Sequence, residues 1–161
     1  MSKKKQELYL AYGSNLNTRQ MLFRCPEASL YDVALLTDYE LVFRGTPHGA
    51  YASVEPHPGM NVPVALWKVS KSDIDSLDSY EGFPRHYRKE TVSCVASGKK
   101  INAFVYIMNE SMGTYNLPSR AYLQTVYEGY TELGFDVSCL FNAVCRSYLQ
   151  AQNTFYFNME E

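Results

Sequence analysis

The sequence predicts an α+β fold in which a small mixed β-sheet curls into a barrel with helices around it. Strand-like segments dominate the first two thirds of the chain, and helix-like segments dominate the last third. Short helices interrupt the strands at irregular spacing, unlike the regular alternation of a βαβ array. The length of 161 residues suits a single domain, expected to span 1–161, and a hydrophobic content of 46% is enough for its core.

The first elements expected are a strand, a loop and a short helix. Leu8–Tyr12 is largely apolar, as in a short buried strand, and a Gly-Ser-Asn turn follows it. Asn17 or Thr18 can cap a helix, because both side chains can accept a hydrogen bond from a free N–H group of the first turn. That helix has to end before Pro26, since the residue ahead of a proline avoids helical backbone angles.

The middle of the chain is expected to form strands. Apolar runs or alternating apolar residues mark them at Tyr31–Leu35, Leu41–Phe43, Ala50–Val54, Val62–Val69, Arg88–Ala96 and Lys99–Met108. The first of these alternates as a half-buried strand would. A turn is expected at Pro56–Gly59, and Ser97-Gly98 predicts a hairpin between the last two strands.

The first longer helix is expected after the strand that ends at Val69. Ser70 or Ser72 can cap it, and apolar side chains recur on one side up to its end at Glu81. Gly82 fits the position just past a helix end, where glycine accepts left-handed backbone angles. The sequence therefore places Glu81 at the C-terminal end of this helix.

Two further helices are expected near the C-terminus. Ser119 opens one of them, Tyr122 begins its apolar face, and Gly134 ends it. The last helix is expected over residues 138–150. Residues 151–161 are expected to be a loosely held tail.

Charge and the absence of an apolar leader limit the expected partners and location. The net charge is −2, and the only basic cluster, Lys3–Lys5, is expected to be a solvated tail. Without a wider basic face, nucleic acid is not an expected partner. No segment reads as an apolar signal or reaches membrane-spanning length, so we expect a soluble, cytoplasmic protein without a membrane partner.

The cysteines and histidines do not predict a metal site. Four cysteines are widely spaced without a Cys-x-x-Cys pair, and the histidines do not supply the spacing of a zinc site. Buried free thiols are the expected state, which favours a reducing cytosol. The cysteines are Cys25, Cys94, Cys139 and Cys145. No chemistry is assigned to the three loop histidines, His48, His57 and His86.

The loop after the first strand is a candidate anion-binding site. Tyr12 ends the strand, and Gly13 allows the backbone angles that aim successive N–H groups at one oxyanion. Ser14 and Asn15 add side-chain donors, and Leu16 completes the motif. An ordinary Gly-Ser-Asn turn is the alternative. Ser14 is not expected to be a nucleophile, because the sequence lacks Gly-x-Ser-x-Gly and nominates no histidine partner.

Glu81 is the candidate acid or base. The C-terminal end of a helix carries partial negative charge, which disfavours an ionised carboxylate. Burial among the neighbouring rings of Tyr80, Phe83 and Tyr87 would raise the pKa of Glu81 further. A carboxyl group whose pKa lies near neutrality is an effective general acid or base. The alternative is an exposed glutamate at a fraying helix end.

Three further side chains have two interpretations each. Arg44 and Arg88 lie at strand ends, where arginine binds either a substrate carboxylate or, as is usual, the acids of the protein itself or water. Tyr122 either packs in the core or directs its hydroxyl into a pocket.

Two motifs far apart in the sequence resemble those of the γ-glutamyl cyclotransferase family, which includes AIG2-like domains. They are the Tyr-Gly-Ser-Asn-Leu loop at 12–16 and the Leu-Asp-Ser-Tyr-Glu-Gly segment at 77–82. Either motif alone is weak, whereas the pair in this order is specific. The later Pro-Ser-x-x-Tyr segment at 118–122 is also similar, and the resemblance covers roughly residues 7–137.

The resemblance implies a small mixed barrel with a cavity and an enzyme that needs neither a metal nor another cofactor. Tyr12–Leu16 would hold the α-carboxylate end of a small γ-glutamyl substrate, and Tyr122 would hydrogen-bond it. Glu81 would be the general acid and base in a reaction that releases 5-oxoproline and a free amine, as in glutathione metabolism. The oligomeric state stays open between a monomer and a homodimer.

Three rival interpretations remain at this point. The same scaffold could cyclise a γ-glutamyl group off a different amine or off a biosynthetic intermediate, with selectivity set by the loops at 44–49 and 110–117. A non-catalytic module could bind a small acidic metabolite through the loop at Tyr12. A protein-interaction domain would instead expose a large apolar patch and have no cavity.

Overall fold

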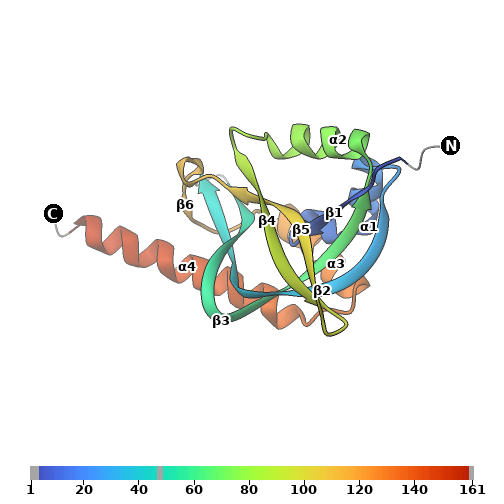
Figure 1. Cartoon of the computed structure of the whole chain (residues 1–161). Coiled ribbons are helices and arrows are strands. Elements are labelled where there is room, and N and C mark those ends of the chain that lie inside the picture. Colours follow the sequence, from blue (N-terminus) through green and yellow to red (C-terminus); the bar gives the residue numbers. More distant parts are fainter. Residues whose placement is uncertain (1–3, 47–48, 160–161) are drawn as a thin grey trace.

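Residues 4–46 and 49–159 are described by the computed structural model of the chain, so the expectations for Lys3 and His48 fall outside them. Within these residues, five strands form a closed mixed barrel with four helices around it, which confirms the predicted α+β fold (Figure 1). The strands are β1 (Glu7–Ala11), β2 (Ser29–Thr46), β3 (Gly49–Val69), β4 (Tyr87–Ala96), β5 (Lys99–Met108) and the short β6 (Thr114–Tyr115). The helices are α1 (Thr18–Arg24), α2 (Lys71–Glu81), α3 (Arg120–Glu132) and α4 (Val137–Met159), with 3-10 turns η1 (Ser14–Leu16) and η2 (Glu110–Met112).

The barrel is mixed because one of its strand pairs is parallel. β1 pairs in parallel with β5 and antiparallel with β3. β4 pairs antiparallel with β5 and with β2. The long antiparallel pairing of β2 with β3 closes the barrel, and β6 adds a short segment to β2.

β2 and β3 are longer than the sequence predicts. Their pairing continues past residues whose types predict the end of a strand. Thr37 pairs with Asn61 and Tyr39 with Pro56, so the expected turn at Pro56–Gly59 forms a bulge inside β3. The N–H group of Gly59 donates to Oδ1 of Asp38 at 2.9 Å, which ties the bulge to the opposite strand. Extra residues of this kind bend a strand without ending it.

The strand at Tyr31–Leu35 is half-buried as predicted, but its larger apolar side chains face outward. Tyr31, Val33 and Leu35 are 46%, 39% and 45% exposed. Ala34 and Leu36 point into the core instead, because pairing with β3 sets them opposite the buried Val64 and Val62. Since side chains alternate, this register turns the other set of side chains outward.

The local start and stop signals of the helices and of the hairpin are confirmed. The side chains of Asn17, Ser70 and Ser119 each accept a hydrogen bond from the third N–H group of their helix. Gly82 ends α2 in the left-handed region with φ of 62°. Ser97 and Gly98 also have positive φ, as the tight hairpin between β4 and β5 requires.

The last helix corrects one prediction. α4 runs from Val137 to Met159, so the helix does not end at 150, and most of the expected loose tail is helical. The sequence from 138 onward contains neither glycine nor proline, so no residue stops the helix. The first half of α4 packs against β2, where Ser147 Oγ accepts from the N–H group of Phe43 at 2.9 Å, and the second half extends past the barrel (Figure 1). No helix in residues 4–46 and 49–159 is both long and apolar enough to span a membrane.

Candidate active site

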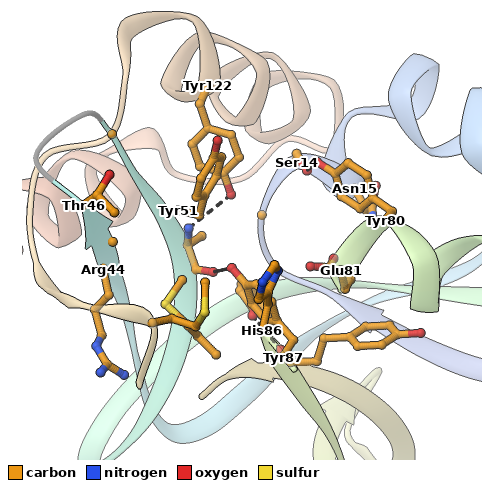
Figure 2. A pocket seen from close by; sticks show the side chains of 18 of the residues that line it. Ser14, Asn15, Arg44, Thr46, Tyr51, Tyr80, Glu81, His86, Tyr87 and Tyr122 are labelled. Carbon is orange, nitrogen blue, oxygen red and sulfur yellow. Dashed lines mark hydrogen bonds between the residues drawn. The ribbon is translucent and has the colours of Figure 1, made fainter. Parts of the chain in front are cut away.

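A cavity of about 300 Å³ opens at one end of the barrel, between η1, the end of α2, the start of β4 and the start of α3 (Figure 2). Its wall is rich in tyrosines, and Glu81 is the one carboxylate among its lining residues. The tyrosines are Tyr9, Tyr12, Tyr51, Tyr80, Tyr87, Tyr106 and Tyr122. A concave, largely apolar pocket with a few converging polar groups is typical of a small-molecule site.

The predicted anion loop forms a tight 3-10 turn at the edge of this cavity. The N–H groups of Leu16 and Asn17 donate to the carbonyls of Gly13 and Ser14, both at 3.0 Å. The N–H groups of Gly13, Ser14 and Asn15 have no backbone acceptor in the part of the chain that the structure describes. Three adjacent donors are therefore available at the cavity edge, where an anion would receive them.

Gly13 allows two other walls to come close to the loop. A side chain at this position would place its Cβ 3.1 Å from the hydroxyl of Tyr122 and 3.3 Å from Cβ of Ala52. Leu16 does not line the cavity; it is fully buried and anchors the turn from behind. The structure thus brings Tyr12, Gly13 and the residues up to Asn15 to the cavity, and it places Leu16 in the core.

The side chains of Ser14 and Asn15 bind other protein groups. Ser14 Oγ lies 3.1 Å from the hydroxyl of Tyr80. The amide of Asn15 donates to the hydroxyl of Tyr9 at 3.0 Å, and its carbonyl accepts from Arg24 at 2.6 Å. The side-chain partner of Ser14 in the described part of the chain is therefore a tyrosine hydroxyl.

Glu81 is the last residue of α2, and its side chain points into the cavity (Figure 2). Within residues 4–46 and 49–159 its carboxyl group has no hydrogen bond and no ion pair. Burial raises the pKa of Glu81 to about 7, and the positive charge of Arg24 opposes this shift. The negative end of the helix acts in the same direction as burial. At neutral pH this carboxyl can both accept and return a proton.

Two tyrosines on the opposite wall share one backbone partner. The hydroxyl of Tyr122 accepts from the N–H group of Ala52 at 3.2 Å, and the hydroxyl of Tyr87 donates to the carbonyl of Ala52 at 3.0 Å. Because Tyr122 accepts this bond, its own hydroxyl hydrogen is free to donate. Burial raises the pKa of Tyr122, so it stays protonated at neutral pH. Figure 2 shows Tyr122 and Tyr51 across the cavity from Ser14 and Glu81.

The arginines at the strand ends pair with the protein itself. Arg44 lines the cavity, but its guanidinium lies 3.5 Å from Glu55 and donates to the carbonyls of Glu110 and Gly113. Arg88 pairs with Glu90 at 2.8 Å and does not line the cavity. The usual interpretation of a strand-end arginine is therefore the correct one for both.

Sequence reasoning missed some of the cavity wall, notably His86. Its ring packs so closely on Gly82 that a Cβ at that glycine would lie 2.5 Å from Nδ1. The signal available was its position five residues after Glu81, in the turn that leads into β4. Tyr9, Tyr51 and Met112 were also missed, because no local motif marks them. Within the described residues, no three His, Cys, Asp or Glu side chains gather where they could hold a metal ion.

Comparisons with known proteins agree with the motifs. The sequence pattern described as "Gamma-glutamyl cyclotransferase, AIG2-like" matches residues 9–125. A gamma-glutamylcyclotransferase of Bos taurus is 35% identical over 137 residues, which cover 79% of this chain and 71% of the relative. The gamma-glutamylcyclotransferase of Homo sapiens is 34% identical over 136 residues, with the same coverage of 79% and 71%. A solved structure named gamma-glutamyl cyclotransferase aligns with a TM-score of 0.76 at 32% identity and covers 83% of each chain.

The chain therefore belongs to the γ-glutamyl cyclotransferase, AIG2-like family, and it is an enzyme of this type. The matched segment contains the loop that begins at Tyr12, the helix end at Glu81 and the wall residue Tyr122.

Proposed function

We propose that this enzyme cyclises a γ-glutamyl compound to 5-oxoproline and a free amine, with Glu81 as general base and then general acid. The observation that carries the proposal is the unpaired carboxyl of Glu81 inside the cavity, with a pKa of about 7, beside a loop with three available N–H groups. The loop attracts the α-carboxylate of the substrate, and the cavity volume of about 300 Å³ suits a small molecule.

Glu81 starts the reaction by making the substrate amine nucleophilic. The α-ammonium group of the substrate gives a proton to the carboxylate of Glu81, and the resulting amine attacks the γ-carbonyl carbon. The new C–N bond closes the five-membered ring, and the bond from the γ-carbon to the leaving nitrogen breaks. Glu81 returns its proton to that nitrogen, since an amide nitrogen leaves far more readily once it is protonated.

The protons balance over the whole reaction. The attacking nitrogen loses two protons as it changes from ammonium to lactam N–H. The departing nitrogen gains two as it changes from amide N–H to ammonium. Glu81 carries one proton at a time, so it makes two successive transfers from the attacking nitrogen to the departing nitrogen, which a pKa near neutrality supports.

The rest of the cavity orients the glutamyl chain. With its α-carboxylate on the N–H groups of Gly13 to Asn15, the chain has to fold back for its amine to reach its own γ-carbonyl. Such intramolecular orientation can lower a barrier by roughly 7–11 kcal/mol. The free hydroxyl hydrogen of Tyr122, which lies beside Gly13, supports a role in binding the substrate.

The proposal is tested by direct product analysis. Purified protein is incubated with γ-glutamyl amino acids, γ-glutamyl amines and glutathione, and 5-oxoproline is measured by mass spectrometry. Glu81→Gln keeps the shape but removes the base, and Glu7→Gln is the control because Glu7 is exposed on β1 and does not line the cavity. We expect product from the wild type and from Glu7→Gln, and at least a 100-fold loss in Glu81→Gln, at the lower end of general acid–base effects.

Other outcomes separate the rival interpretations. Product from Glu81→Gln at the wild-type rate would remove Glu81 from the mechanism. Ligand-induced thermal stabilisation of the wild type without product would favour a binding module. The spectrum of accepted leaving groups identifies the physiological class of substrate, including amines outside glutathione metabolism.

Location and assembly are part of the proposal. The four cysteines are free, which supports a reducing compartment such as the cytoplasm, although only Cys25 and Cys94 are buried as expected and Cys145 is exposed. The net charge of −2 supports a small-molecule partner rather than nucleic acid. Light scattering on the purified protein decides between a monomer and a homodimer.

A further inference from the structure

Arg24 connects the two halves of the active site from just outside the cavity. It is the last residue of α1, and its guanidinium carbon lies 3.6 Å from the centre of the Tyr80 ring. Nη1 donates to Oδ1 of Asn15 at 2.6 Å, and Nη2 donates to the side chain of Gln20 at 2.8 Å. The guanidinium thus uses its face for Tyr80 and its edge for Asn15 and Gln20.

These contacts complete a ring of interactions between the loop and the end of α2. Asn15 belongs to the anion loop, and Tyr80 directly precedes the base Glu81. The hydroxyl of Tyr80 lies 3.1 Å from Oγ of Ser14, which adds a second link between the same two segments. Figure 2 shows Ser14, Asn15 and Tyr80 together above Glu81. Arg24 and the Ser14–Tyr80 contact therefore both join the loop to the end of α2.

Arg24 also supplies positive charge near Glu81. The remaining titratable groups that face Glu81 are hydroxyls from every wall and one imidazole. They are Tyr9, Tyr12, Tyr51, Tyr80, Tyr87, Tyr106, Tyr122 and His86. Arg44 is the cation among the lining residues, and its guanidinium pairs with Glu55 at 3.5 Å. Burial raises the pKa of Tyr9, Tyr12 and Tyr87, so these hydroxyls carry no charge at neutral pH.

We infer that Arg24 is a positioning residue of the γ-glutamyl reaction, which holds the loop at Gly13–Asn15 at a fixed distance from Glu81 through its contacts with Asn15 and Tyr80. The inference rests on the proposed function, because it assigns the loop to the substrate and Glu81 to the proton transfers. Arg24 does not line the cavity, so it acts through Asn15 and Tyr80.

Two substitutions separate the geometric effect from the effect of charge. Arg24→Lys keeps the charge but loses the planar fork and most of the stacking on Tyr80. Arg24→Met keeps an apolar stem of similar length and loses both. Arg19→Met is the matched control, because Arg19 lies exposed on the same helix and no contact to the site involves it.

The readout is the pH profile of kcat/KM for 5-oxoproline formation, with thermal unfolding measured alongside. Arg24→Lys should lower the plateau of kcat/KM roughly 10-fold through a displaced loop, with the acid limb unchanged. Arg24→Met should lower the plateau similarly and shift the acid limb upward by about one pH unit, because an opposite charge no longer lowers the pKa of Glu81. Arg19→Met should match the wild type.

Three results would overturn the inference or the function separately. A wild-type plateau in Arg24→Lys would remove the positioning role, and this variant decides the matter even if Arg24→Met does not fold. An unshifted acid limb in Arg24→Met would remove the role of its charge. Failure of the proposed function appears differently, as no product from the wild type or as full activity in Glu81→Gln.

Discussion

Replacing Gly129 with alanine should displace the loop at Gly13–Asn15, which is proposed to bind the substrate, without changing a residue of the cavity wall. Gly129 lies in α3, where the helix packs directly on η1. An added Cβ would lie 2.7 Å from the carbonyl carbon and Cβ of Leu16, and 2.8 Å from the backbone nitrogen of Asn17. Because carbon atoms pack at about 3.5–4.0 Å, loop and helix have to separate by roughly 0.8 Å or more.

Stability and activity should respond to Gly129→Ala by different amounts. Overpacking costs about 1–3 kcal/mol of the free energy of unfolding. The higher helix propensity of alanine offsets about 1 kcal/mol of this cost, so the free energy of unfolding should fall by about 0–2 kcal/mol in total. A displacement near 1 Å of a substrate-binding group can cost up to about 100-fold in rate, so we expect kcat/KM to fall between about 10- and 100-fold.

The assay compares steady-state 5-oxoproline formation with urea unfolding of the same preparations. Gln124→Ala is the control, because it is an exposed substitution on the same helix. The expected pattern is a folded Gly129→Ala protein with a raised KM and a lowered kcat/KM. Wild-type kinetics in Gly129→Ala would refute the reasoning that the backbone position of η1 controls substrate binding.

Two further predictions concern Glu81 and Tyr122. Folding raises the pKa of Glu81 from 4.5 to about 7, so its effect on stability is favourable below about pH 4.5 and is lost as the pH rises through 7. Glu81→Gln should therefore raise the free energy of unfolding at pH 8 by roughly 1–2 kcal/mol after allowance for solvent screening. Urea titrations at pH 4 and pH 8 measure this difference. An equal effect at both pH values would contradict the burial of this carboxyl. Tyr122→Phe should raise KM about 10-fold, as loss of one substrate hydrogen bond would, with a stability loss of about 1–3 kcal/mol because the N–H group of Ala52 loses its acceptor. Unchanged KM in a correctly folded Tyr122→Phe would remove Tyr122 from substrate binding.

Structural features that depend on only a few adjacent residues, such as helix caps and helix ends, could be predicted from the sequence. The caps were predictable at Ser119, and to within two candidates each at Asn17 and Ser70, because a short polar side chain accepts from an N–H group three residues away. Gly82 was predictable because its backbone angles suit a helix end. The position of Glu81 follows from these signals, since it lies between a capped start and a glycine stop.

Features that depend on strand register could not be predicted in this way. Pro56–Gly59 carries the composition of a turn, and only its pairing across from Asp38 shows that it is a bulge. Likewise Tyr51 faces the cavity because β3 and α3 come together there, which no neighbour in the sequence indicates. α4 exceeds its predicted length for a simpler reason. Its C-terminal half contains no glycine or proline that would mark where the helix ends.

The backbone of Ala52 joins two aromatic rings of the cavity wall. Its N–H and C=O groups hold the hydroxyls of Tyr122 and Tyr87, and Ala52 is itself paired with Phe43 in the barrel ladder. The two rings are therefore fixed to the sheet and not to a mobile loop, and a displacement of one carries the other with it. A wall joined in this way resists changes in its spacing, so under the proposed function we expect it to accept the folded glutamyl chain more readily than bulkier glutamyl analogues.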